Sequence, residues 1–241
     1  MSHSAISLGL GLGGGKSATS SGGGGGGGVF TNGASVDFDG ADDYATPAST
    51  ITLSGNKSIT FWAYFDTVTG QKTAAGRDGV NYYTILFNGS SSVVVRFGAT
   101  PVAYSVPALS ATTWTHFAFT GDNSDFKLYI NGSEAASGTD YGDVILAIFG
   151  SINTSGYGAF NGKIDEFACF NSTLSPSDVA TIANAGGASG SKGIDLKGYE
   201  PVHWWRMGDI NGSSGATIAD QGSGGVAMTL VNSPAYSTDV P

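Results

Sequence analysis

The stretch WTHFAFTGDNSDFKLYINGSEAASG, residues 114–138, carries the clearest strand pattern in this sequence. Phe117 and Phe119 alternate with His116 and Ala118, and successive side chains of a β-strand point to opposite faces of a sheet. A second alternating run follows, with its apolar side chains at Phe126, Leu128 and Ile130. The dipeptide Asn131-Gly132 after this run is a strong hairpin-turn signal. The stretch therefore predicts antiparallel strands with one buried face each.

The same pattern extends outward in both directions along the chain. Short runs rich in Val, Ile, Phe, Tyr and Thr are separated by clusters of Gly, Asn, Asp and Ser, which is typical of an all-β sandwich. The predicted strands are residues 35–39, 58–65, 82–87, 92–97, 115–120, 126–131, 163–170 and 226–231.

One short helix is expected in the run LSPSDVATIANAGG. Ser175 is a good N-cap, Pro176 fits the first helical position and Asp178 fits the third. Gly186 is the expected C-terminal stop.

Composition limits the kinds of partner. The chain has 241 residues, a net charge of −9 and only 10 Lys+Arg. Nucleic-acid binding needs basic residues that neutralise phosphates, so we expect no nucleic-acid partner. There is no run of 18 apolar residues and no basic segment followed by an apolar one at the start, so we expect neither a membrane partner nor a secretion signal. Cys169, the only cysteine, is expected to be buried in a strand.

Residues 1–29 form a low-complexity, Gly-rich N-terminal arm. Gly15-Lys16-Ser17 has the ending of a phosphate-binding loop, but the first glycine of that motif would fall on Leu10. Seven consecutive glycines at 22–28 then stand where the motif needs a helix. Polyglycine allows backbones to approach closely, so we interpret residues 1–30 as an arm that binds other copies of the chain or other proteins. A passive spacer is the alternative.

Three ordered motifs carry a resemblance to a known family. They are GASVDFDGADDYA at residues 33–45, the opening stretch at 114–138, and FNGKIDEFACFNSTLSPSDV at 160–179. Together they resemble the laminin-G-like, or concanavalin A-like, jelly-roll domains. The resemblance implies a single jelly-roll β-sandwich over residues 30–241, with residues 199–241 completing the same sandwich. The segment WWRMGD at 204–209, with the following DQGSGG and LVNSP, resembles a segment attached to such domains in tailed-bacteriophage virion proteins.

This resemblance leaves several functions open, because one fold hosts lectins, glycosidases, adhesins and capsid decorations. The first hypothesis is a non-enzymatic structural protein of a phage particle, located in the virion as a capsid decoration or a tail-associated protein. Residues 1–30 would anchor it to virion proteins, and the lectin-like sandwich would be displayed. The alternative is a carbohydrate-binding module or adhesin that recognises host surface glycans. A glycoside hydrolase is the second alternative.

The carboxylates give little support to a hydrolase. Glycoside hydrolysis needs two carboxyl groups at a defined separation. Asp165 and Glu166 are adjacent, so on a regular strand they would point to opposite faces. The three glutamates, Glu134, Glu166 and Glu200, form no E-x-D-x-x-E pattern of the kind that glucanases of this fold carry. We therefore expect no enzymatic activity and no catalytic residue.

Acidic side chains are candidates for a structural Ca²⁺ site, since Ca²⁺ prefers oxygen ligands. The family often binds calcium near the sandwich rim, and the resemblance offers Asp39, Asp42 and Asp165 as ligands. The alternative is that these residues only form turns.

Tyrosines in or beside Gly-rich turns are candidates for carbohydrate contact. Sugar sites of this fold combine an exposed aromatic ring with Asn or Asp side chains. The candidate residues are Tyr82, Tyr83, Tyr104, Tyr141 and Tyr157. The alternative is that they fill the core or the sandwich rim. Trp204 and Trp205 must face opposite ways, so one of them is a candidate for exposure, and His116 is expected to pair on the strand surface.

Overall fold

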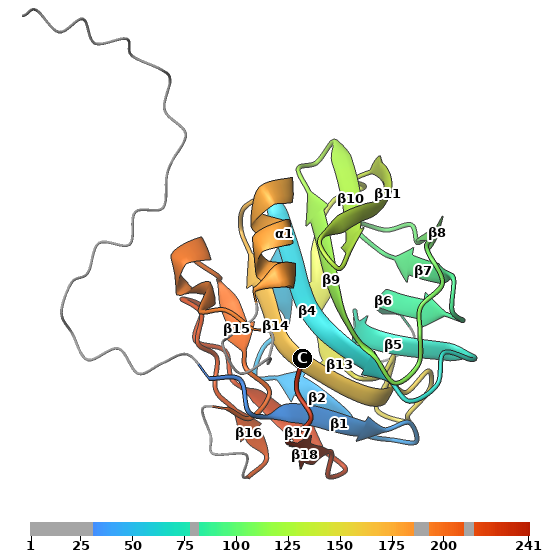
Figure 1. Cartoon of the computed structure of the whole chain (residues 1–241), viewed down its shortest axis with the longest axis vertical. Coiled ribbons are helices and arrows are strands. Elements are labelled where there is room, and N and C mark those ends of the chain that lie inside the picture. Colours follow the sequence, from blue (N-terminus) through green and yellow to red (C-terminus); the bar gives the residue numbers. More distant parts are fainter. Residues whose placement is uncertain (1–30, 78–81, 186–192, 210–214) are drawn as a thin grey trace, which may run out of the picture.

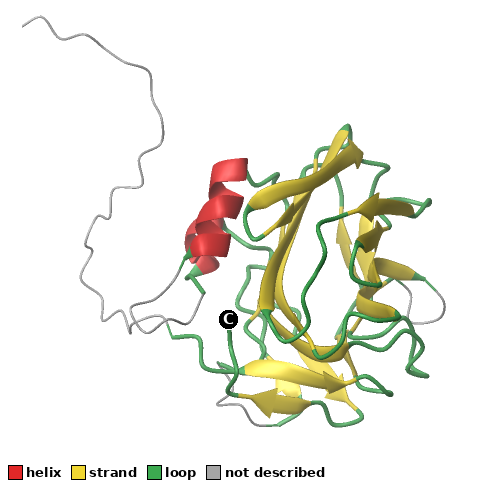
Figure 2. Ribbon diagram, turned by 45° about the vertical axis from the view of Figure 1, so that its right-hand side comes forward, coloured by secondary structure: helices red, strands yellow, loops and turns green. Residues whose placement is uncertain are grey.

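The computed structural model describes residues 31–77, 82–185, 193–209 and 215–241. The Gly-rich arm predicted for residues 1–29 and the helix stop predicted at Gly186 lie outside these residues. Two large antiparallel sheets pack face to face, and one helix lies on the outer face of one sheet (Figures 1 and 2). The predicted all-β jelly-roll sandwich is thereby confirmed. Within the described ranges, no helix is both long and apolar enough to cross a membrane.

The sheet that carries the helix, sheet A, contains the opening stretch of the sequence analysis. Its strand order is β11 (Ser133–Thr139), β10 (Asp125–Ile130), β9 (Trp114–Gly121), β4 (Lys57–Phe65), β14 (Asn161–Phe170), β1 (Ser35–Asp39) and β18 (Ala235–Ser237). Strand β15 (His203–Trp205) also pairs with β14, beyond the part that pairs with β1. The predicted hairpin is confirmed, because Asn131 and Gly132 join β10 to β11 with φ of 49° and 81°.

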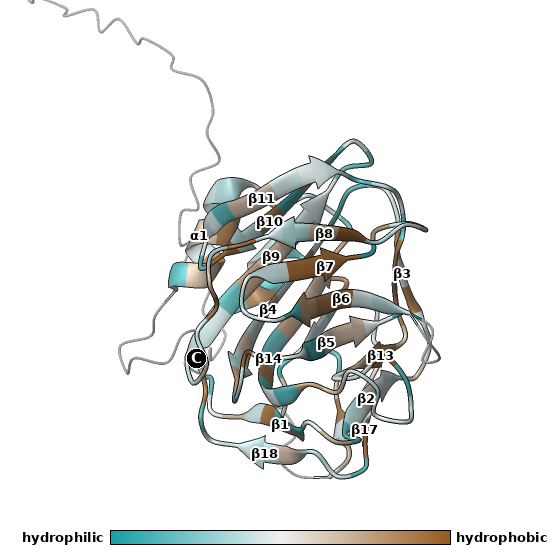
Figure 3. Cartoon of the chain, turned by 90° about the vertical axis from the view of Figure 1, so that its right-hand side faces the viewer, coloured by the Kyte–Doolittle hydropathy of each residue, from teal (hydrophilic) through white to brown (hydrophobic). Residues whose placement is uncertain are grey.

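The opposite sheet, sheet B, consists mostly of short strands. Its order is β16 (Thr217–Ile218), β17 (Met228–Val231), β2 (Tyr44–Pro47), β13 (Ile148–Phe149), β5 (Gln71–Gly76), β6 (Tyr83–Asn88), β7 (Ser92–Val95) and β8 (Val102–Ser105). Figure 3 looks onto this sheet and shows the apolar run of β7 in brown. Strands β3 (Ile51–Leu53) and β12 (Val144–Leu146) form a separate antiparallel pair.

Aromatic rings form the core between the two sheets. Phe61 of β4 stacks on Phe167 of β14 with ring centroids 4.9 Å apart. Phe61 also meets Phe87 of β6 edge-on at 6.5 Å. Each fully buried Phe contributes about 1.5–3 kcal/mol relative to an exposed one, so these rings are the main attachment between sheet A and sheet B. Cys169 is buried in the same core, as predicted.

The helix α1 (Pro176–Asn184) covers part of the outer face of sheet A (Figure 2). Its predicted start is confirmed: Ser175 accepts a hydrogen bond from Asp178 N, and the Asp178 carboxylate accepts one from Ser175 N, which is a reciprocal capping box. Val179 and Ile182 pack into a second apolar cluster on this face. A short 3-10 helix, η1 (Leu196–Tyr199), lies beside it and adds Leu196 to the cluster.

Strands from the C-terminal segment join both sheets. β15 pairs with β14 and β18 with β1 in sheet A, whereas β17 pairs with β2 in sheet B. Trp204 and Trp205 do face opposite ways, as predicted. The expectation that one of them is exposed is wrong, because Trp205 lies in the core and α1 and η1 cover Trp204.

A β-bulge in β14 changes the direction of two carboxylates. The register with β4 shifts between Asp165 and Ala168, and Glu166 has a positive φ of 49°. The extra residue of a bulge lets neighbouring side chains point to the same side of the sheet. Asp165 and Glu166 both lie on the outer face, and Phe167 returns to the core. The prediction that the two carboxylates face opposite ways is therefore wrong.

Candidate functional site

One rim of the sandwich is acidic at the turn between β1 and β2. Carboxylate oxygens of Asp39, Asp42 and Asp43 all lie within 4.8 Å of one another. The turn itself holds two of them in place. Asp39 Oδ1 accepts a hydrogen bond from Ala41 N at 2.8 Å, and Asp43 Oδ2 accepts one from Asp39 N at 3.1 Å.

These three carboxylates fit a hard divalent cation. Ca²⁺ binds oxygens at about 2.3–2.6 Å, so one ion can reach atoms separated by up to about 5 Å. Burial raises the pKa of Asp43, and the negative charges of Asp39 and Asp42 raise it further, against a lowering by its backbone hydrogen bond. A cation between the groups would relieve this repulsion. Asp39 and Asp42 are exposed, so the ion would be accessible to a ligand.

A loop with an exposed tyrosine packs against this acidic turn. Tyr157 is 65% exposed. Asn153 Oδ1 accepts hydrogen bonds from Ser155 N at 3.0 Å and Tyr157 N at 3.2 Å, which fixes the backbone of the loop. A side chain at Gly156 would overlap the Ala41 carbonyl oxygen, so the two loops are in direct backbone contact. We call the acidic turn and this loop, residues 39–43 and 153–157, the acidic rim.

The other candidate tyrosines lie elsewhere. Tyr82 is 50% exposed, and the Arg96 guanidinium lies 4.8 Å from its ring centroid and 5.5 Å from that of Tyr83. Tyr141 is 54% exposed. Tyr104 is half-buried and stacks on Phe126 at 4.8 Å; burial, and secondarily the neighbouring Tyr141, raises its pKa. The other four candidate tyrosines thus lie away from Tyr157.

Asp165 lies apart from the other two predicted calcium ligands. Its Oδ2 accepts a hydrogen bond from Asn32 at 3.0 Å, and its Oδ1 accepts one from Glu166 N at 2.8 Å. Burial, and then the adjacent Glu166 charge, raises the pKa of Asp165. The structure therefore groups Asp39 and Asp42 with Asp43, and places Asp165 in a buried network on the outer face of sheet A.

Glu166 is the centre of that buried network. Its Oε1 accepts a hydrogen bond from Arg206 Nε at 3.0 Å, and its Oε2 accepts one from Trp204 Nε1 at 2.5 Å. Burial raises the pKa of Glu166 to about 7, although the Arg206 charge opposes that shift. Arg206 also pairs with Asp209 at 2.5 Å and donates to the carbonyl of Thr31. Through these hydrogen bonds the pair connects β14 to the segments that contain Asn32, Trp204 and Arg206. Because Asp165 and Glu166 are buried, they offer no surface to a substrate.

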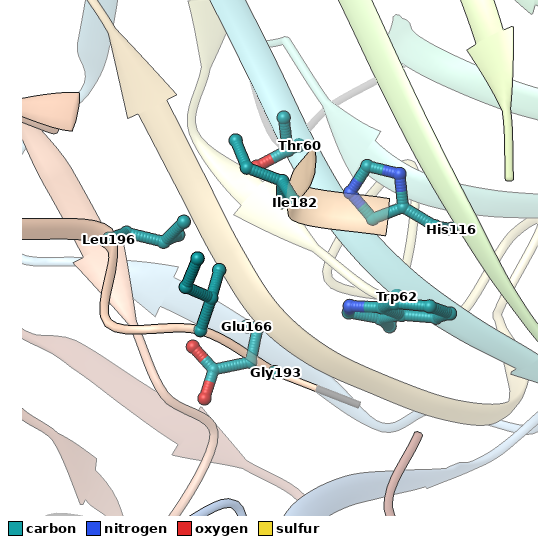
Figure 4. A pocket seen from close by; sticks show the side chains of 8 residues that line it. Thr60, Trp62, His116, Glu166, Ile182, Gly193 and Leu196 are labelled. Atoms are coloured by element: carbon teal, nitrogen blue, oxygen red, sulfur yellow. The ribbon is translucent and has the colours of Figure 1, made fainter. Parts of the chain in front are cut away.

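A small cavity beside this network contains His116. Figure 4 shows Thr60, Trp62, His116 and Glu166 around it, and its volume is about 10 Å³, the size of one water molecule. His116 is buried, and neither ring nitrogen has a hydrogen-bond partner in the part of the chain that the structure describes. Burial lowers its pKa to about 3. The expectation that His116 pairs on the strand surface is wrong, because α1 and residues 193–196 cover that part of sheet A.

The predicted calcium ligands left out Asp43, although it adjoins Asp42 in the same turn. Arg96 had no signal in the sequence, because only the pairing of β6 with β7 brings it to Tyr82 and Tyr83.

The chain belongs to the concanavalin A-like lectin/glucanases superfamily, since the family of that description matches residues 38–180, more than half of the sequence. A solved structure of a candidate carbohydrate-binding protein from Bacteroides ovatus is similar, with 18% identity and a TM-score of 0.60. That match covers 86% of this chain and 60% of the other, so the chain spans less than two thirds of that protein. The native heptameric SAP-like pentraxin from Limulus polyphemus is similar at 12% identity and a TM-score of 0.50, over 67% of this chain and 86% of that one. Comparison with curated proteins gives no match. At these identities the solved structures show the fold alone.

Proposed function

We propose that this chain is a non-catalytic carbohydrate-binding module whose principal binding site is the acidic rim. The observation that carries the proposal is the packing of the Tyr157 loop against the acidic turn. An exposed aromatic ring can stack on the apolar face of a sugar ring, and adjacent carboxylates can accept hydrogen bonds from sugar hydroxyls. The acidic rim therefore offers both kinds of contact that a sugar needs, on a turn and a loop that are held in place.

A Ca²⁺ ion held by Asp39, Asp42 and Asp43 would supply an electrostatic contact to sugar oxygens. The turn provides the ligands without rearrangement, because backbone hydrogen bonds already orient Asp39 and Asp43. Nearby polar groups are also fixed: Asn232 Nδ2 donates to Asp42 O at 2.8 Å, which holds the turn against the end of β17. We therefore expect sugar binding at this rim to depend on calcium.

The buried position of Asp165 and Glu166 supports a binding role rather than hydrolysis. They are 0% and 4% exposed, and Arg206, Trp204 and Asn32 occupy their oxygens. A hydrolase would need such a pair to contact the scissile bond.

A glycan-binding screen with and without Ca²⁺ tests the proposal, followed by isothermal titration with the best neutral oligosaccharide. Tyr157→Ala and Asp42→Asn should each weaken binding at least tenfold, because they remove the stacking surface and one cation ligand. Glu134→Gln is the matched control for charge, since Glu134 is an exposed carboxylate on β11 and does not belong to the acidic rim. Calcium-independent binding that survives both rim variants would refute the proposal.

A second candidate function, an anchored structural component of a phage particle, draws support from the base of the arm. Residues 31–33 are fixed to the sandwich: Arg206 binds Thr31 O, Asn32 binds Asp165, and Gly33 N donates to Asp209 Oδ1 at 2.8 Å. An arm of residues 1–30 would thus be joined to a segment that is bound to the sandwich. If the arm binds a particle, the sandwich is then held to that particle as well. Light scattering on the full chain and on a chain beginning at Val29 tests this. Loss of an oligomer, or of binding to a particle, on truncation is expected, and identical assembly of both would refute it.

A further inference from the structure

Two arginines bind the same turn, which follows strand β7 of sheet B. Arg77 Nη1 donates a hydrogen bond to Gly98 O at 2.5 Å, and Arg96 Nη1 donates one to Ala99 O at 2.6 Å. The two acceptors belong to adjacent residues, so both guanidinium groups bind the same turn. Each of these hydrogen bonds uses one N–H, and a guanidinium group carries five N–H donors.

Neither guanidinium has a carboxylate partner among residues 31–77, 82–185, 193–209 and 215–241. The salt bridges of these residues instead involve Lys57, Lys127, Lys163, His203 and Arg206. In a chain with a net charge of −9, two arginines that bind one turn and have no ion-pair partner among the described residues concentrate positive charge there. Such a site attracts an anion against the overall charge of the protein.

Exposed aromatic rings flank the two arginines. Tyr82 lies over Arg96 on one side. On the other side, a side chain at Gly98 would overlap the Tyr141 carbonyl oxygen, so Tyr141 lies directly against the turn. Gly98 N also donates to Asp143 O at 2.8 Å, which joins the two loops.

Buried contacts hold the residue that precedes Tyr141 in place. The preceding residue, Asp140, is buried and pairs with Lys57 Nζ at 2.5 Å. Asp140 also accepts hydrogen bonds from Asn123 N at 2.8 Å and Gly142 N at 3.1 Å. A buried residue with satisfied hydrogen bonds therefore holds the backbone next to Tyr141, whose side chain is 54% exposed, and a fixed backbone favours binding.

We propose that Arg77, Arg96, Tyr82 and Tyr141 form a second site, which binds an acidic oligosaccharide. Guanidinium groups match carboxylates and sulfate esters through paired N–H donors, and the tyrosine rings provide flat surfaces for sugar rings. The choice of a sugar rests on the proposed function, whereas the choice of an anion rests on the two arginines. The second site uses other residues than the acidic rim: Arg77 directly follows β5 and Arg96 directly follows β7, whereas the rim consists of residues 39–43 and 153–157.

The test is isothermal titration at 20 mM and 300 mM salt, without calcium. The probes are trigalacturonate, its carboxyl-reduced neutral form, a sulfated galactan trisaccharide and a glutamate hexapeptide. We expect trigalacturonate or the sulfated sugar to bind, the neutral form to bind at least tenfold more weakly, and affinity to fall at high salt. The first two probes distinguish a carboxylate from a sulfate ligand. No binding of either acidic sugar, or equally tight binding of the peptide, overturns the proposal.

Single substitutions test whether binding uses the proposed residues. Arg77→Gln and Arg96→Gln should each raise the Kd at least tenfold, and Tyr141→Ala, which alters only an exposed ring, should do so without changing the melting temperature. Lys127→Gln is the matched control for charge, because Lys127 is exposed on β10 and pairs with Glu134. Unchanged affinity in the arginine variants overturns the proposal. Loss of calcium-dependent binding in Tyr157→Ala reports on the acidic rim alone, so the two proposals fail separately.

Discussion

Replacing His116 with leucine should stabilise the protein, and more so in acid. The ring is buried against Trp62 with centroids 5.0 Å apart, in the cavity of about 10 Å³. A buried polar group without a hydrogen bond costs about 1–3 kcal/mol. Leucine has a similar volume and no polar atom, so the variant should gain roughly that amount at pH 7.

The pH dependence gives the sharper test. The folded pKa of His116 is about 3, below the ordinary value of 6.5, so the unfolded chain binds the proton first as the pH falls. Protonation of the unfolded chain at His116 therefore has little effect above pH 6.5, and stability is lost as the pH falls from 6.5 towards 3. At pH 5 the loss is about 2 kcal/mol, from about 1.36 kcal/mol for each of roughly 1.5 pH units. The difference in the free energy of unfolding between His116→Leu and the parent should increase by that amount between pH 7 and pH 5.

Urea denaturation at both pH values measures this difference. With a slope of about 2–3 kcal/mol per molar, a change of about 2 kcal/mol moves the difference in midpoints by roughly 0.7–1 M. Thr60→Val is the control, because Thr60 Oγ1 is buried in the same cavity without a partner among the described residues and does not titrate. It should stabilise at both pH values by the same amount. Parallel loss of stability in the parent and His116→Leu would refute the reasoning.

Three further outcomes are expected. Glu166→Ala should destabilise the protein by about 3–5 kcal/mol in chemical denaturation, because it removes the carboxylate that pairs with the Nε atom of the buried Arg206. A cost below about 1 kcal/mol would show that this ion pair does not stabilise the fold. Millimolar Ca²⁺ should raise the melting temperature of the parent but not of Asp42→Asn, and an equal rise in both would exclude the three-carboxylate site. Gly156→Ala should destabilise the protein and weaken calcium binding, because φ is 76° and the methyl group would overlap Ala41 O; calorimetry and a calcium titration that match the parent would contradict this.

The elements that could be predicted from the sequence are those whose signals are local. The alternation in β9 and β10, the Asn131-Gly132 turn and the capping box of Ser175 each involve residues within four positions of one another. Strands β5 and β11 were not predicted, because QKTAAG and SEAASGT each hold a single β-branched residue, a threonine, and no aromatic residue. Their pairing with β6 and β10 determines their conformation.

The bulge in β14 could not be predicted for a similar reason. The sequence GKIDEF reads as regular alternation, and glutamate does not favour a positive φ. Arg206 and Trp204, about 40 positions later, bind the Glu166 side chain in that conformation. The error about the faces of Asp165 and Glu166 thus came from a contact that is remote in sequence.

The distribution of exposed aromatic residues links the fold to the proposed function. The outer face of sheet A is closed by α1, η1 and the C-terminal residues, where Asp239 accepts a hydrogen bond from Trp114 Nε1 and pairs with Lys163. Among the described residues, the large exposed apolar side chains are Tyr82, Tyr141 and Tyr157. Each lies on or against a loop that borders sheet B: before β6, beside the turn after β7, and next to Gly158, which binds β5. Because the segments that complete sheet A also bury its face, we expect the proposed sugar binding to use these loops of sheet B.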